Sequence, residues 1–83
     1  MNNNIQLGGA FKEIFSLIKK RHLKIIDCAP VTMSEKKGFV GISRGLWYRV
    51  WFDTEHNSQT LLTTSNKKRA LEKFEELKKK YHE

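Results

Sequence analysis

The sequence has a single cysteine, Cys28, and no long apolar run. One thiol cannot form a disulfide within the chain, and such sparing use of cysteine is typical of a reducing compartment. A helix that crosses a membrane needs about 20 mostly apolar residues, whereas the apolar runs here are only a few residues long. The segment 1–9 also lacks the basic and apolar regions of a secretory signal. We therefore expect a cytoplasmic protein without a membrane span.

The sequence is also poor in the residue groupings that catalysis and metal binding require. Its histidines are His22, His56 and His82, which lie far apart in the chain and lack metal-ligand spacing with Cys28. Cys28 itself follows an aspartate on a predicted strand, which favours a buried thiol over a nucleophile. No glycine-rich phosphate loop is present. We therefore expect that the protein is not an enzyme, and that it has no catalytic residues, no bound metal and no cofactor.

Acidic residues are outnumbered: nine aspartates and glutamates stand against 16 lysines and arginines, and the net charge is +7. A field of that sign attracts polyanions, which include nucleic acid, an acidic protein surface and an anionic membrane. The 83 residues suffice for one domain, 1–83, with a modest core. A deep substrate pocket is hard to build at this size, so we expect a surface that binds an anionic partner.

Apolar spacing and turn residues predict two helices around a group of strands. Residues 1–8 form a polar tail that we expect to fray. Strands are predicted at 23–28, 39–43, 46–53 and 58–63, and a first helix over 10–21. Residues 64–66 offer three possible N-caps for a second helix, which follows them to about Tyr81. Pro30 should end the first strand or place it at a sheet edge. Short connections favour antiparallel pairing. We predict an α+β domain in which a three- to four-stranded antiparallel meander carries both helices on one face.

The strand predicted over 46–53 is the most informative segment. Because side chains alternate across a sheet, Leu46 and every second residue after it should face the helices. Trp47, Arg49 and Trp51 should then share the opposite, open face. An arginine between aromatic rings can contact phosphates or bases while the rings stack. The same residue types also anchor protein interfaces. A third interpretation is that one tryptophan lies in the core and the strand is buried on both faces.

A second candidate site lies at the start of the last helix. Lys67, Lys68 and Arg69 fall in its first turn, where positive charge opposes the helix dipole. The arrangement makes sense if a phosphate binds the free N–H groups and the three cations together. The alternative is a solvated basic turn. Arg44 lies at the end of the second strand and can border the same open face as Trp47.

Residues 41–81 resemble the amino-terminal arm-site DNA-binding domains of tyrosine-recombinase integrases, and in layout the plant ethylene-response-factor domain. The segments that carry the resemblance are 44–52, 58–64 and 65–71. It implies a three-stranded sheet laid in the major groove of DNA, with contacts from Arg44, Trp47, Arg49 and Trp51. The chain has no catalytic recombinase domain, so the resemblance implies a free-standing accessory factor of a phage or mobile element.

The leading hypothesis is a nucleic-acid-binding protein, with duplex DNA favoured over RNA. It assigns nucleic-acid contacts to Arg44, Trp47, Arg49, Trp51, Lys67, Lys68 and Arg69. The alternative is an interaction or inhibitor module that docks on an acidic protein through Trp47 and Trp51. Either a monomer or a homodimer joined at a strand edge is compatible with the sequence. Membrane association is less favoured, because the apolar stripe of the first helix is needed to cover the sheet.

Overall fold

The computed structural model describes residues 9–81, with side chains from residue 13 onward. Its elements in chain order are α1 (Gly9–Arg21), β1 (Ile25–Met33), β2 (Lys36–Arg44), β3 (Tyr48–Asp53), β4 (Ser58–Thr64) and α2 (Lys67–Lys80). The strands form one antiparallel sheet in the order β1-β2-β3-β4. The predicted α+β class and antiparallel meander are thus confirmed. The tail expected at 1–8 lies outside the described residues.

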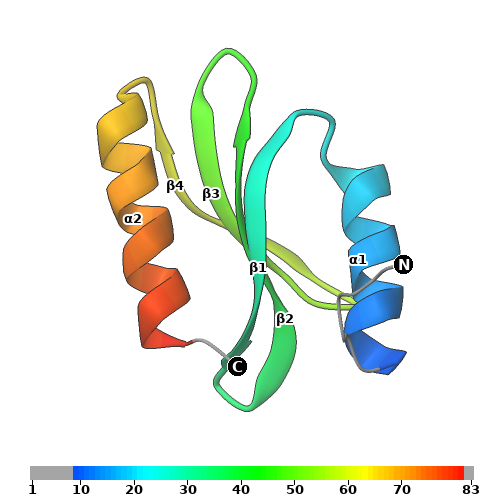
Figure 1. Ribbon diagram of the computed structural model, residues 1–83. Coiled ribbons are helices and arrows are strands. Elements are labelled where there is room, and N and C mark those ends of the chain that lie inside the picture. The colour runs from blue at the N-terminus through cyan, green and yellow to red at the C-terminus, as the bar shows by residue number, and fades with distance from the viewer. Residues whose placement is uncertain (1–8, 82–83) are drawn as a thin grey trace, which may run out of the picture.

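The two helices cover opposite faces of the sheet (Figure 1). The core beneath α2 contains Val31, Val40, Ile42, Val50, Phe52, Ala70, Phe74 and Leu77. The core beneath α1 contains Ile14, Ile18, Phe39 and Trp51. The prediction that both helices pack on one face is therefore wrong. Because Phe39 and Trp51 alternate with the apolar residues beneath α2, both sheet faces are apolar here, and each needs a helix to exclude water.

The first hairpin is longer than the sequence predicted. Ser34 and Glu35 have φ angles of 53° and 64°, and these left-handed conformations are typical of a tight two-residue turn whose twist matches that of the strands. Met33 consequently pairs directly with Lys36. Pro30 lies within β1 and pairs with Phe39, which is tolerated because β1 is an edge strand.

Local hydrogen bonds fix both ends of α2. Asn66 is the N-cap, and its side chain accepts a hydrogen bond of 3.1 Å from the Arg69 backbone N–H. It is one of the three cap residues expected at 64–66. At the other end, the Tyr81 carbonyl oxygen accepts a hydrogen bond of 2.9 Å from the Thr32 N–H. The C-terminal end of α2 is thereby attached to the outer edge of β1.

Candidate anion-binding end of the sheet

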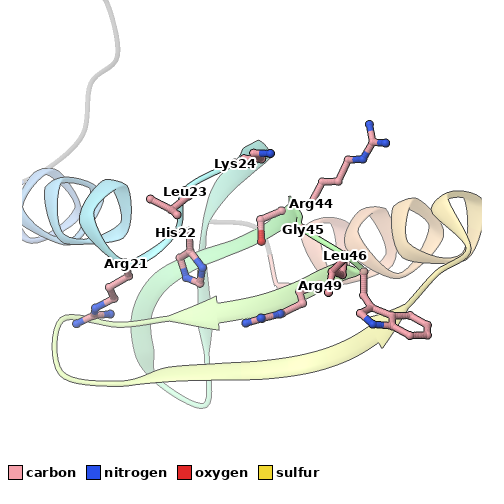
Figure 2. Close-up of a pocket in the computed structure, with 10 residues that line it drawn as sticks. Arg21, His22, Leu23, Lys24, Arg44, Gly45, Leu46 and Arg49 are labelled. Atoms are coloured by element: carbon pink, nitrogen blue, oxygen red, sulfur yellow. The ribbon is translucent and has the colours of Figure 1, made fainter.

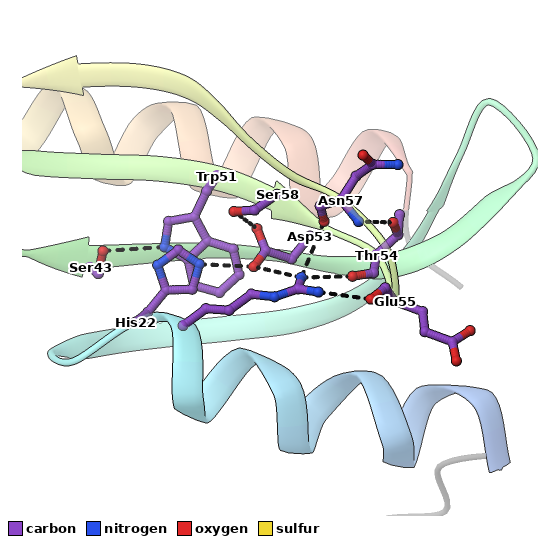
Figure 3. A network of polar contacts seen from close by, with 9 residues as sticks. His22, Ser43, Trp51, Asp53, Thr54, Glu55, Asn57 and Ser58 are labelled. Atoms are coloured by element: carbon purple, nitrogen blue, oxygen red, sulfur yellow. Dashed lines mark hydrogen bonds and ion pairs between the residues drawn. The ribbon is translucent and has the colours of Figure 1, made fainter.

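Trp51, predicted as an exposed nucleic-acid contact, lies in the core and is only 1% exposed. Its indole stacks on the His22 imidazole, and its Nε1 donates a hydrogen bond of 3.2 Å to Ser43 Oγ (Figure 3). The prediction of exposure is wrong at this position because α1 covers the sheet face that was predicted to be open. The interpretation that one tryptophan lies in the core is correct for Trp51.

A buried polar cluster lies beside Trp51. The Asp53 side chain is fully buried, with Oδ2 2.9 Å from His22 Nε2 and 3.4 Å from Arg21 Nη1. Its Oδ1 accepts a hydrogen bond of 2.8 Å from Ser58 Oγ. A buried carboxylate needs such partners, since leaving it unpaired would be very costly. The cluster compensates for the burial of Asp53, the last residue of β3. It also attaches the C-terminal end of α1 to the sheet.

Arg21 continues this cluster into the β3–β4 connection. Its guanidinium donates hydrogen bonds to three backbone carbonyl oxygens: 2.8 Å to Thr54, 2.7 Å to Glu55 and 3.2 Å to Asn57. A guanidinium offers five N–H donors in a planar fork, which suits several acceptors at once. We conclude that Arg21 stabilises the fold, and that its charge is only partly available to a partner.

The connection between β2 and β3 carries exposed apolar side chains. Leu46 is 99% exposed and Trp47 is 53% exposed. The Gly45 N–H donates a hydrogen bond of 2.9 Å to the Trp47 carbonyl oxygen, which closes this short loop before β3 begins at Tyr48. Leu46 therefore lies in a loop, and the prediction that it faces the core is wrong. Trp47 is accessible to a partner, as the sequence analysis expected.

A groove separates this loop from the connection between α1 and β1. It encloses about 440 Å³ and is lined by both connections and by Arg49 of β3 (Figure 2). Its exposed cations are Arg21, Lys24, Arg44 and Arg49, of which Arg21 is already bound to Asp53 and the β3–β4 loop. The Arg44 N–H donates a hydrogen bond of 3.0 Å to the Lys24 carbonyl oxygen, which joins the two connections at its edge. We call this hollow, which is lined by residues 21–24, 43–47 and Arg49, the basic groove.

The basic groove has an unbalanced positive charge. None of the described residues that line it is acidic, and within residues 9–81 no ion pair involves Lys24, Arg44 or Arg49. Arg44 lies over the Tyr48 ring at 5.8 Å from its centroid, which leaves its charge unneutralised. Lys24 was not among the contacts predicted from the sequence. Leu23 was predicted to lie in a strand, whereas β1 begins only at Ile25.

The basic first turn of α2 lies at the same end of the sheet. Thr64, the last residue of β4, pairs with Tyr48, so the chain enters α2 beside the β2–β3 connection (Figure 1). Lys67, Lys68 and Arg69 are exposed, and they do not line the basic groove. The Asn66 side chain already accepts a hydrogen bond from the Arg69 backbone N–H. A phosphate bound here would therefore depend more on the lysine and arginine side chains than on free backbone N–H groups. Of the residues predicted to contact nucleic acid, only Trp51 is buried and does not belong to this exposed end of the sheet.

Cys28 is half-buried on β1. Burial raises the pKa of its thiol to about 11, with a further rise from the charge of Asp27 and an opposing effect from Lys19. A thiol with that pKa is protonated at neutral pH and is a poor nucleophile. Across the described part of the chain, no three histidine, cysteine or acidic side chains come together as a metal site. Neither described helix has the length and apolar character that a membrane crossing requires.

Comparison of the chain with protein-family models, with curated proteins and with solved structures finds no significant match. The resemblance to integrase arm-site domains therefore stays a prediction.

Proposed function

We propose that this protein binds nucleic acid through one end of its sheet, formed by the basic groove and the first turn of α2. The observation that carries the proposal is the grouping of Lys24, Arg44 and Arg49, which form no ion pair with the described residues, around one hollow with exposed apolar side chains. Phosphates are recognised by lysine and arginine side chains, and bases by apolar and aromatic surfaces. Nucleic acid presents both in one molecule.

The remaining charge supports this choice of partner. Lys67, Lys68 and Arg69 extend the positive surface beyond the groove, and the net charge of +7 attracts a polyanion from a distance. A row of phosphates can satisfy several such cations at once, whereas a single small anion satisfies only a few. The proposal includes the expected cytoplasmic location and the role of an accessory factor of a phage or mobile element.

The mode of binding differs from the one that the sequence favoured. Duplex DNA laid on an open sheet face would need Trp51 in contact with it, and α1 covers that position. The proposed surface is therefore the end of the sheet. The second candidate partner is an acidic protein that contacts Trp47 and the arginines. The exposed Leu46 beside them also suits a protein interface.

The test is a fluorescence anisotropy titration of labelled DNA and RNA oligonucleotides with the purified protein at two salt concentrations. Binding should weaken steeply with salt, because phosphate contacts release counterions. The double variant Arg44→Ala/Arg49→Ala should bind about tenfold more weakly, with a salt slope smaller in magnitude by about 2.

The matched control is Lys36→Ala/Lys79→Ala. It removes the same charge from exposed positions at the β1–β2 turn and near the C-terminal end of α2, away from the basic groove (Figure 1). If both double variants lose affinity equally, binding follows net charge and the groove is not the site. If no oligonucleotide binds while an acidic protein does, the second candidate replaces the first.

A further inference from the structure

We propose that the basic groove holds an unpaired nucleotide, so that the preferred partner is single-stranded nucleic acid. This inference rests on the proposed function and specifies its substrate class. Three large apolar side chains that line the groove are exposed to solvent. Leu23 is 94% exposed on the α1–β1 connection, and Leu46 and Trp47 are exposed on the β2–β3 connection. Figure 2 shows the two connections meeting at this end of the sheet.

Exposed apolar residues are common singly, but a group of them beside a cavity marks a binding surface. Burying each of these side chains against an apolar group of the partner would stabilise the complex, because apolar surface is removed from water. The cations of the same groove, Lys24, Arg44 and Arg49, require that the partner also be anionic. The partner must therefore present an apolar surface and a phosphate within one small volume.

The size of the groove fits a discrete unit. Its volume of about 440 Å³ falls within the range of about 300–1,000 Å³ typical of small-ligand sites. His22 and Ser43 add polar groups to the lining, and such groups can bind the edge of a base. One nucleotide, with its base against the apolar side chains and its phosphate against the arginines, matches the groove in size and chemistry.

Pairing state then decides between forms of nucleic acid. In a duplex the faces of the bases are stacked on one another and their pairing edges are occupied. Leu23, Leu46 and Trp47 would find no apolar surface there. An unpaired nucleotide exposes both its face and its edges beside the phosphate, and stacking on side chains is the usual way in which proteins hold single strands. The exposed apolar residues thus favour a single strand.

An anionic membrane also combines phosphate with apolar groups. A membrane surface is broad, however, and is best met by a convex group of apolar side chains. Here the guanidinium groups and His22 line a hollow between the two connections, which suits an inserted group. Single-stranded nucleic acid is therefore the partner that the arrangement favours, and the membrane becomes an outcome of the test.

The experiment compares a fluorescein-labelled oligothymidine with a blunt duplex of equal phosphate number, by anisotropy at one salt concentration. The single strand should bind at least about fivefold more tightly, the lower end of what stacking of one base provides. The variant Leu46→Ala/Trp47→Ala should remove most of that preference. Ile26→Ala is the matched control, since Ile26 is an exposed apolar residue that does not line the groove. Thermal unfolding of each variant checks that the fold is kept.

The outcomes separate this inference from the proposed function. Equal, salt-dependent binding of both forms would overturn the inference and leave nucleic-acid binding standing. The inference also fails if the preference for the single strand survives in Leu46→Ala/Trp47→Ala. Tighter binding to vesicles of phosphatidylcholine and phosphatidylserine than to either oligonucleotide would replace it with a membrane site. Absence of binding to both oligonucleotides would overturn the proposed function as well.

Discussion

The imidazole of His22 lies flat against the indole of Trp51, with ring centroids 4.0 Å apart and an angle of 5° between the ring planes. The same imidazole contacts the buried Asp53 carboxylate through Nε2. His22 follows the last residue of α1, whereas Trp51 and Asp53 lie in β3. These contacts hold the end of α1 on the sheet, and they place the α1–β1 connection beside the basic groove.

His22→Ala should lower the free energy of unfolding by about 2–3 kcal/mol. The variant loses the ring stack and leaves the buried Asp53 with one partner fewer. Urea denaturation followed by circular dichroism measures the change. His56→Ala is the control, since His56 is exposed and its one ion pair, with Glu55, lies on the surface, so its effect should stay within about 0.5 kcal/mol. Equal effects of the two substitutions would show that the contacts of His22 do not stabilise the fold.

Arg21→Ala should destabilise the protein by about 1–2 kcal/mol, because three backbone carbonyl oxygens of the β3–β4 loop lose a charged donor. Lys20→Ala removes the same charge from the neighbouring exposed position of α1. It should change stability by no more than about 0.5 kcal/mol. The comparison uses the midpoint of urea unfolding. A loss as large for Lys20 as for Arg21 would mean that charge alone is responsible.

Gly41→Ala should destabilise the fold by about 1–3 kcal/mol, the usual cost of overpacking. Gly41 is the cross-strand partner of Trp51, and a Cβ at this position would collide with the indole ring. The near-ultraviolet circular dichroism of the buried tryptophan should change as well. Gly45→Ala is the control, because a Cβ there meets no atom within 4 Å. Normal stability of Gly41→Ala would contradict the close packing of the indole on β2.

The Cys28 thiol should react slowly at pH 8. Since burial and Asp27 raise its pKa from 9.0 to about 11, the reactive thiolate is less populated in the folded protein than in the unfolded chain. Reaction with a chromogenic disulfide at pH 8 should be at least about tenfold slower in buffer than in concentrated urea. Equal rates in the two solutions would show that the folded environment does not suppress ionisation.

Local patterns were sufficient to predict the class of the fold. Short polar connections between apolar segments indicate a meander, and the threonine, serine and asparagine at 64–66 mark the start of α2. The extent of β1 could not be predicted, because Ser34 and Glu35 adopt left-handed conformations that usually favour glycine or asparagine. The alternation of strand 46–53 also continues through Leu46, although the strand begins only at Tyr48.

The location of Trp51 depends on a contact that the local sequence does not specify. Alternation separates Trp51 from Val50 and Phe52, yet it does not say which face a distant helix will cover. Ile14 and Ile18 of α1 could have packed on either face, and their packing on Phe39 and Trp51 is a long-range choice. The same choice exposes Leu23 and Lys24 at the end of α1, so the basic groove could not be found from strand patterns alone.

The two tryptophans provide the most direct test of where a partner binds. In a ¹⁵N-labelled sample, the two indole N–H signals are recorded by NMR during titration with oligothymidine. The Trp47 signal should shift, together with the backbone amides of 23–24, 44–49 and 67–69, while the Trp51 signal, whose N–H is bonded to Ser43, should move little. Shifts confined to Trp51, to the β1–β2 turn or to the C-terminal end of α2 would contradict binding at the basic groove.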